Sequence, residues 1–122
     1  LYRELFFPHD AELVRRLGAH VLFHLHSTGM KHYRHVLELP GIAGLEVTLE
    51  ANGPPPSALL PAFGEILERS RLILVVDGHF EEARDVIRRL PRAGLYVLVS
   101  SRFLPSEAAF REFLASTAPA GA

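Results

Sequence analysis

The sequence predicts an α/β protein built from four successive strand–helix units, the number found in half of a (β/α)8 barrel. Short apolar runs alternate with longer amphipathic segments along the chain. The apolar runs start about 25 residues apart, and glycine or proline separates most of the units. The 122 residues are enough for one domain with one modest core.

A leading helix and the first strand open the chain. The helix is predicted over 8–17, because Pro8 suits a first helical turn and Gly18 suits a stop. The first strand is predicted at 20–26, where apolar residues alternate with histidines. A short helix over 30–39 follows and ends at a Pro-Gly pair.

The second unit begins with a strand at 45–50, in which leucine and valine alternate with glutamate and threonine. This alternation predicts one face packed under helices and one face directed into a barrel or cleft. The segment 51–56 is a predicted loop, since its prolines cannot donate to a strand ladder. A helix is expected over 57–69, with Ser57 as its N-cap.

The third and fourth units complete the pattern. Five consecutive apolar residues at 72–76 predict a strand buried on both faces. A charged amphipathic helix over 80–90 leads to the last strand at 95–99, and a final helix is expected over about 105–114. The whole chain, 1–122, is expected to form a single partial domain.

Strands that alternate with helices favour a parallel sheet with right-handed crossovers. Two architectures fit this order: an open doubly wound sheet, and part of a barrel. No Gly-x-Gly-x-x-Gly follows a strand, which weakens a dinucleotide-binding interpretation. In both architectures, the ligand-binding residues belong in the loops after the carboxyl ends of the strands.

Composition limits the class of partner. The net charge is -1, with 13 basic and 14 acidic residues, so no basic excess indicates nucleic acid. The chain contains no cysteine, which excludes disulfides and thiolate metal ligands within it and fits the cytoplasm. No apolar run approaches the ~20 residues of a membrane span. The start of the chain lacks a signal-peptide pattern. Because the chain begins with Leu1 rather than methionine, we expect a piece of a longer protein.

His24 and His26 are the sharpest candidate pair. Residues two apart in a strand point to the same face, so both imidazoles can enter one cavity and bind a metal or an anion. A third ligand would come from another strand, from Glu46, Asp77 or His79. The alternative is that both histidines only hydrogen-bond to their neighbours at a strand end.

Other polar residues follow the remaining strands. Glu46 is a candidate acid–base group because a carboxylate that faces inward is costly unless it is paired. Asp77 is a candidate base or ligand, although Asp-Gly also favours a plain turn. Asn52, Ser101 and Arg102 are candidate substrate-binding residues, and Arg102 in particular suits a substrate carboxylate.

Three segments resemble the uroporphyrinogen decarboxylase superfamily, which includes cobalamin-dependent methyltransferases. The segment His24-Leu25-His26-Ser27-Thr28-Gly29 resembles the superfamily's His-x-Cys-Gly or His-x-Asp-Gly strand end. Residues 39–46 resemble its Leu-Pro-Gly passage before a strand, and residues 51–57 resemble its Gly- and Pro-rich loop before a helix. The similarity runs from about residue 17 to residue 114.

The resemblance implies the C-terminal half of a (β/α)8 TIM barrel. Such a half needs an N-terminal half-barrel or a second copy of itself, since it leaves two strand edges and an apolar interior open. In the methyltransferases, the zinc ligands are a His-x-Cys pair and a later cysteine. His24 matches their histidine, His26 falls at their first cysteine, and Ser101 at the later one. Zinc and a corrinoid partner are therefore the implied cofactors.

The leading hypothesis is an enzyme of this superfamily that acts on a small or tetrapyrrole-related substrate. His24, His26, Glu46, Asp77 and Ser101 would line its site. Methyl transfer is slightly favoured over decarboxylation. The alternative is a non-catalytic barrel remnant that binds a small ligand or a partner, which the loss of both cysteines favours. A flavodoxin-like regulatory domain ranks last, because the clustered aspartates and lysine of a phospho-receiver are missing.

Overall fold

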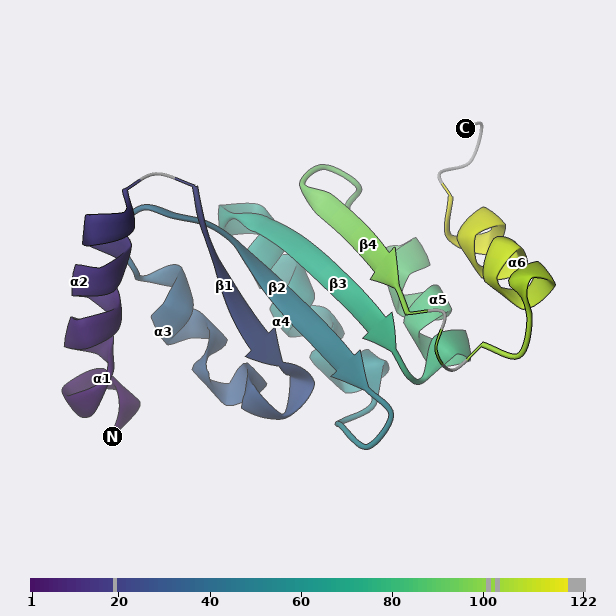
Figure 1. The fold of residues 1–122 in the computed structure, drawn as a ribbon, viewed down its shortest axis with the longest axis horizontal. Coiled ribbons are helices and arrows are strands. Elements are labelled where there is room, and N and C mark those ends of the chain that lie inside the picture. Colours follow the sequence, from purple (N-terminus) through teal and green to yellow (C-terminus); the bar gives the residue numbers. More distant parts are fainter. Residues whose placement is uncertain (19, 101, 103, 119–122) are drawn as a thin grey trace.

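The computed structural model describes residues 1–18, 20–100, 102 and 104–118. Its centre is a four-stranded parallel sheet in the order β1-β2-β3-β4 (Figure 1). The strands are β1 (Val21–His26), β2 (Ile42–Glu50), β3 (Arg71–Asp77) and β4 (Leu95–Val99). The predicted α/β class and its four strand–helix units are therefore confirmed.

The helices divide into three groups around this sheet. The first group is α1 (Tyr2–Leu5) and α2 (Phe7–Leu17), which lie beside the β1 edge. The second group covers one face of the sheet and consists of η1 (Ser27–His32), α3 (Tyr33–Leu37), α4 (Pro56–Arg69) and α5 (Phe80–Arg89). The third is α6 (Glu107–Thr117), beyond the β4 side. In the described part of the chain, no helix is long and apolar enough to cross a membrane.

The hydrophobic core lies between the sheet and the helices that cover it. Alternate residues of the two central strands are fully buried there, among them Leu45, Val47 and Leu74. Phe63 and Ile66 pack onto them from α4. This one-sided packing holds the sheet and leaves its other face free of core side chains.

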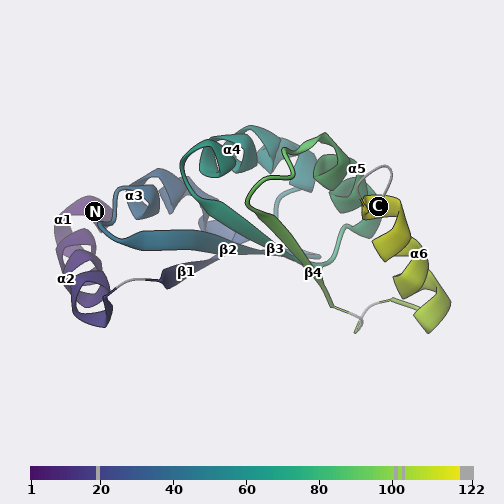
Figure 2. The same ribbon diagram turned by 90° about the horizontal axis from the view of Figure 1, so that it is seen from above.

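The opposite face of the sheet is open. Figure 2 shows α3, α4 and α5 on one side of the strands and, among the described residues, no helix over the other side. Leu22, Tyr96 and Leu98 are consequently 51%, 57% and 53% exposed. The prediction that the third strand is buried on both faces is wrong for this chain, because Ile73 and Val75 are only partly covered.

Several element boundaries differ from the predicted ones. β2 begins at Ile42, three residues before the predicted strand. The predicted helix over 30–39 is a 3-10 helix followed by the short α3. Ser57 is not an N-cap, because Pro56 already occupies the first helical turn and Pro55 stands at the cap without a side-chain hydrogen bond. The last helix, α6, starts later than predicted, at Glu107.

Candidate functional site

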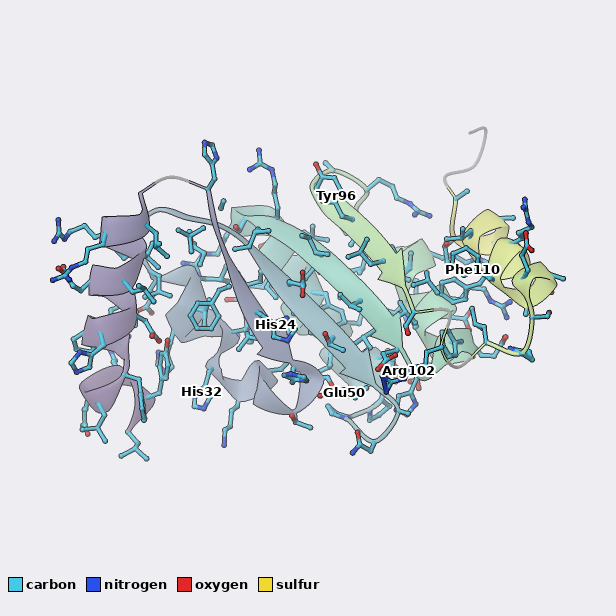
Figure 3. All side chains as sticks on the ribbon, viewed as in Figure 1. His24, His32, Glu50, Tyr96, Arg102 and Phe110 are labelled. Carbon is cyan, nitrogen blue, oxygen red and sulfur yellow. The ribbon has the colours of Figure 1, made fainter. Side chains whose placement is uncertain are left out.

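Polar side chains gather on the open face, toward the carboxyl ends of β1 and β2. The alternation of each strand directs His24 and His26 of β1, and Glu46 and Glu50 of β2, to this face. The parallel register sets His24 beside Glu46 and His26 beside Thr48. Figure 3 labels His24 and Glu50 near this end of the sheet.

Each histidine is paired with a glutamate of the neighbouring strand. His24 Nδ1 lies 2.8 Å from Glu46 Oε1, and His26 Nδ1 contacts Glu50 Oε1. A carboxylate accepts hydrogen bonds, so these contacts favour the tautomer in which Nδ1 of each ring carries the proton and donates. Nε2 of each ring is then left with a free lone pair, which can take a proton or bind a metal ion.

The two imidazole–carboxylate pairs lie next to each other. The ring centroids of His24 and His26 are 4.8 Å apart, and the rings are nearly perpendicular at 88°. The four side chains are partly exposed, and the carboxylates are less exposed than the imidazoles. A small molecule on the open face can therefore reach both rings, while the carboxylates orient them from the side.

Ser27, the first residue of η1, fixes one of these carboxylates. Its backbone N–H donates to Glu50 Oε2 over 3.1 Å, and its hydroxyl donates to the same oxygen. Burial by itself would raise the pKa of Glu50, but the hydrogen bonds from Ser27 and His26 outweigh it and hold the pKa below its usual value. Glu50 is thus an ionised acceptor for the His26 ring at neutral pH.

The sequence places Ser27 and Glu50 among the polar residues at the strand ends, but it predicted no role in the site for either. Glu50 continues the Glu46-Thr48 alternation, so its face was evident, but its contact with His26 depends on the strand register. Ser27 gave no signal beyond its place directly after the first strand. Gly53 also belongs here, because any side chain on it would collide with the Ser27 hydroxyl.

The remaining predicted residues are Asp77, Asn52, Arg102 and Ser101. Asp77 ends β3 directly opposite Glu50 in the register and on the same face, so it stands at the level of the histidine pairs. Asn52 is exposed in the turn after β2. Arg102 is exposed, interacts with another residue, and appears toward the carboxyl ends of the strands in Figure 3. Ser101 lies outside the described residues.

These residues supply only some of the ligands that a metal site needs. In the described ranges, no group of three or more histidine, aspartate or glutamate side chains is placed to hold a metal ion. Glu46 contacts the Nδ1 side of His24, where it orients the ring rather than meeting a metal at Nε2. His79 instead stands at the N-cap of α5 in a left-handed conformation, with φ of 51°. The described residues thus supply two imidazoles and lack the third donor that zinc requires.

The fold and the cluster define an α/β protein with one open sheet face and two imidazole–carboxylate pairs on it. Comparison with protein-family models, with curated proteins and with solved structures finds no match for this chain. The resemblance to the uroporphyrinogen decarboxylase superfamily therefore stays a prediction.

Proposed function

We propose that the chain is half of a (β/α)8 barrel and that its open face is the barrel interior. The consecutive strand order and the placement of α3, α4 and α5 on one face support this proposal, because a doubly wound sheet reverses its strand order and carries helices on both faces. The open face is also layered. Leu22, Ile73 and Tyr96 lie toward the amino ends of their strands, and the polar cluster lies toward the carboxyl ends. Barrel enzymes carry their active sites at that end.

We infer that the cluster is an acid–base site for a small-molecule substrate. The observation that carries this inference is the adjacency of the two pairs, His24–Glu46 and His26–Glu50. A carboxylate at Nδ1 holds an imidazole in one orientation and stabilises its protonated form, which is what a general acid or base needs. Asp77, at the same level, completes the set of polar groups that face the substrate.

Decarboxylation of a tetrapyrrole-related substrate is the reaction that this site supports best. The carboxylate carbon leaves as CO2, the bonding electron pair stays on the substrate carbon, and that carbon takes a proton. A protonated Nε2 of His24 or His26 supplies the proton, and Glu46 or Glu50 stabilises the ring while it carries the charge. Arg102 and Asn52 are the proposed contacts for the remaining polar groups of the substrate.

The test uses uroporphyrinogen as the probe and the complete barrel that contains this half, with CO2 release and binding measured in parallel. We expect wild type to bind and decarboxylate the probe, and His24→Ala and His26→Ala to lose decarboxylation. His9→Ala is the matched control, because His9 is exposed on α2, away from the cluster. Binding without CO2 release in wild type would favour a non-catalytic ligand-binding remnant. Absence of binding would contradict a tetrapyrrole-related substrate.

Methyl transfer is the second candidate. The observation in its favour is that each Nδ1 donates to a carboxylate, an arrangement typical of histidines whose other nitrogen binds zinc. A third ligand and a corrinoid partner would have to come from outside the described residues. Stoichiometric zinc in the purified protein, lost in both His24→Ala and His26→Ala, would support this candidate over decarboxylation. A wild-type protein that binds no zinc would remove it.

A further inference from the structure

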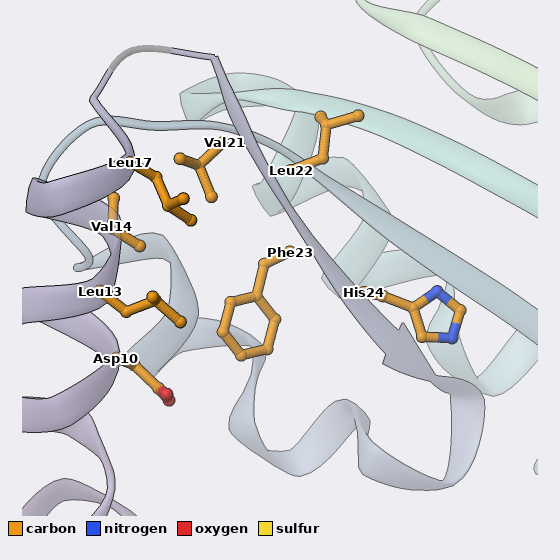
Figure 4. Close-up of a pocket in the computed structure, with 8 residues that line it drawn as sticks. All are labelled: Asp10, Leu13, Val14, Leu17, Val21, Leu22, Phe23 and His24. Atoms are coloured by element: carbon orange, nitrogen blue, oxygen red, sulfur yellow. The ribbon is translucent and has the colours of Figure 1, made fainter.

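A groove with a volume of ≈ 260 Å³ separates α2 from the outer edge of β1. Leu13 and Leu17 of α2 point across it toward Val21 and Phe23 of β1 (Figure 4). The successive residues 21–24 all line this groove, although they point alternately to the two faces of the sheet. The groove therefore runs along the edge of the strand and belongs to neither face.

The edge of β1 that borders the groove is unpaired. Within the described ranges, β1 is hydrogen-bonded to β2 alone and stands at the end of the sheet. Such an edge presents backbone N–H and C=O groups that an extended chain can pair with. The helix wall is apolar and open, since Leu13 and Leu17 are 55% and 63% exposed. These features together fit an occupant with an extended backbone and apolar side chains.

The position of α2 leaves no room for a helix attached to the added strand. Val14, on the inner side of α2, is buried and packs near Gly41, so the helix is anchored to the body of the protein. In a strand–helix–strand unit, the helix covers the joint between the strand before it and the strand after it. α2 precedes β1 and stands beside its edge, so it already fills the place of a helix over the next strand outward.

A second copy of this chain does not suit the groove. Its parallel edge strand is β4, which continues into α6. That helix would compete with α2 for the same place beside β1. Two β1 edges brought together would instead place two α2 helices against each other, because α2 stands beside that edge. An added strand without a helix of its own avoids both the competition with α2 and the contact between two α2 helices.

We propose that this groove is an acceptor site for one extended apolar strand that runs parallel to β1. The groove has a direction: Leu17 and Val21 lie at the amino end of β1, and Asp10 and His24 lie further along it. The incoming strand should therefore carry apolar side chains first and a polar side chain last. The inference rests on the edge, the groove and α2, and the groove shares only His24 with the acid–base site.

The experiment supplies the strand within the same molecule. Leu1 lies at the end of the sheet where the strands finish, so a parallel strand can be fused ahead of it through a short Gly-Ser linker (Figure 1). The donor is a copy of residues 72–76 followed by serine, and the control fusion has proline at the central position of the donor. Hydrogen exchange of the β1 amides is the readout. We expect at least about tenfold slower exchange in the strand fusion than in the proline fusion.

Two further variants and the unfused chain make the test decisive. Leu17→Asp in the strand fusion should restore fast exchange of β1, while Leu114→Asp on α6, an exposed leucine away from the groove, should not. Equal exchange of β1 in the strand and proline fusions would overturn the proposal. An unfused chain that is already dimeric, with slow exchange of β1, would also overturn it by assigning the groove to a second copy.

Discussion

Ser27 donates two hydrogen bonds to one oxygen of Glu50, one from its backbone N–H over 3.1 Å and one from its hydroxyl. The other oxygen of Glu50 accepts from His26. Glu50 therefore ties the start of η1, the end of β1 and the end of β2 together at one point. This point holds half of the proposed acid–base site.

The first prediction concerns acid stability. The pKa of Glu50 is lower in the folded protein than in the unfolded chain, so the unfolded chain binds more protons in mild acid. The free energy of unfolding should fall as the pH drops from about 5 toward the folded pKa of Glu50. Glu50→Gln removes this titration and should flatten that fall. Denaturant unfolding of both proteins between pH 3 and pH 6 measures it.

The matched control for this prediction is Glu68→Gln, a change at an exposed carboxylate of α4. It should keep the wild-type pH dependence. Wild type and Glu50→Gln with parallel curves over the same pH range would show that Glu50 is not held ionised by Ser27 and His26.

The second prediction concerns the close approach of the two loops that follow β2 and β3. A Cβ atom on Gly78 would lie 2.5 Å from the backbone N and Cα of Ala51, which cannot move without shifting the loop after β2. Gly78→Ala should therefore lower the free energy of unfolding by about 1–3 kcal/mol. Thermal or denaturant unfolding gives the value.

Gly64→Ala should change the free energy of unfolding in the opposite direction. Gly64 lies inside α4 with no atom within 4 Å of an added Cβ. Alanine there should raise the free energy of unfolding by about 0.5–1 kcal/mol. A Gly78→Ala protein as stable as Gly64→Ala would mean that the two loops do not touch as described.

The third prediction separates the two faces of the sheet. Leu74 is fully buried under the helices, whereas Leu98 is 53% exposed on the open face. Leu74→Ala should cost about 2–5 kcal/mol of stability. Leu98→Ala, measured in the chain of residues 1–122, should cost less than about 1 kcal/mol. Similar losses for both variants would indicate that the open face is covered in solution.

The strands and the fold class followed from the sequence because their signals are local. Continuous or alternating apolar runs, bounded by glycine and proline, located all four strands within a few residues. The start of β2 was harder to predict. Its first residues, Ile42 to Gly44, do not alternate between apolar and polar side chains, and two of them are small. The N-cap at Ser57 was misplaced because two preceding prolines already set the backbone for the helix start.

The site was only partly predictable because its contacts join different strands. The shared face of His24 and His26 follows from the strand period alone, and so does that of Glu46 and Glu50. The pairing of each histidine with a particular glutamate depends on how β1 and β2 align, which the sequence does not specify. The hydroxyl of Ser27 joins Glu50 only once that alignment exists.

The protonation of the two imidazoles tests the central claim most directly. Long-range 1H–15N NMR at neutral to mildly alkaline pH distinguishes a proton on Nδ1 from one on Nε2 in each histidine ring. We expect the Nδ1–H form for His24 and His26, lost for His24 in Glu46→Leu and for His26 in Glu50→Leu. If both rings carry the proton on Nε2, or if neither leucine variant changes them, the carboxylates do not hold the imidazoles and the proposed acid–base site is contradicted.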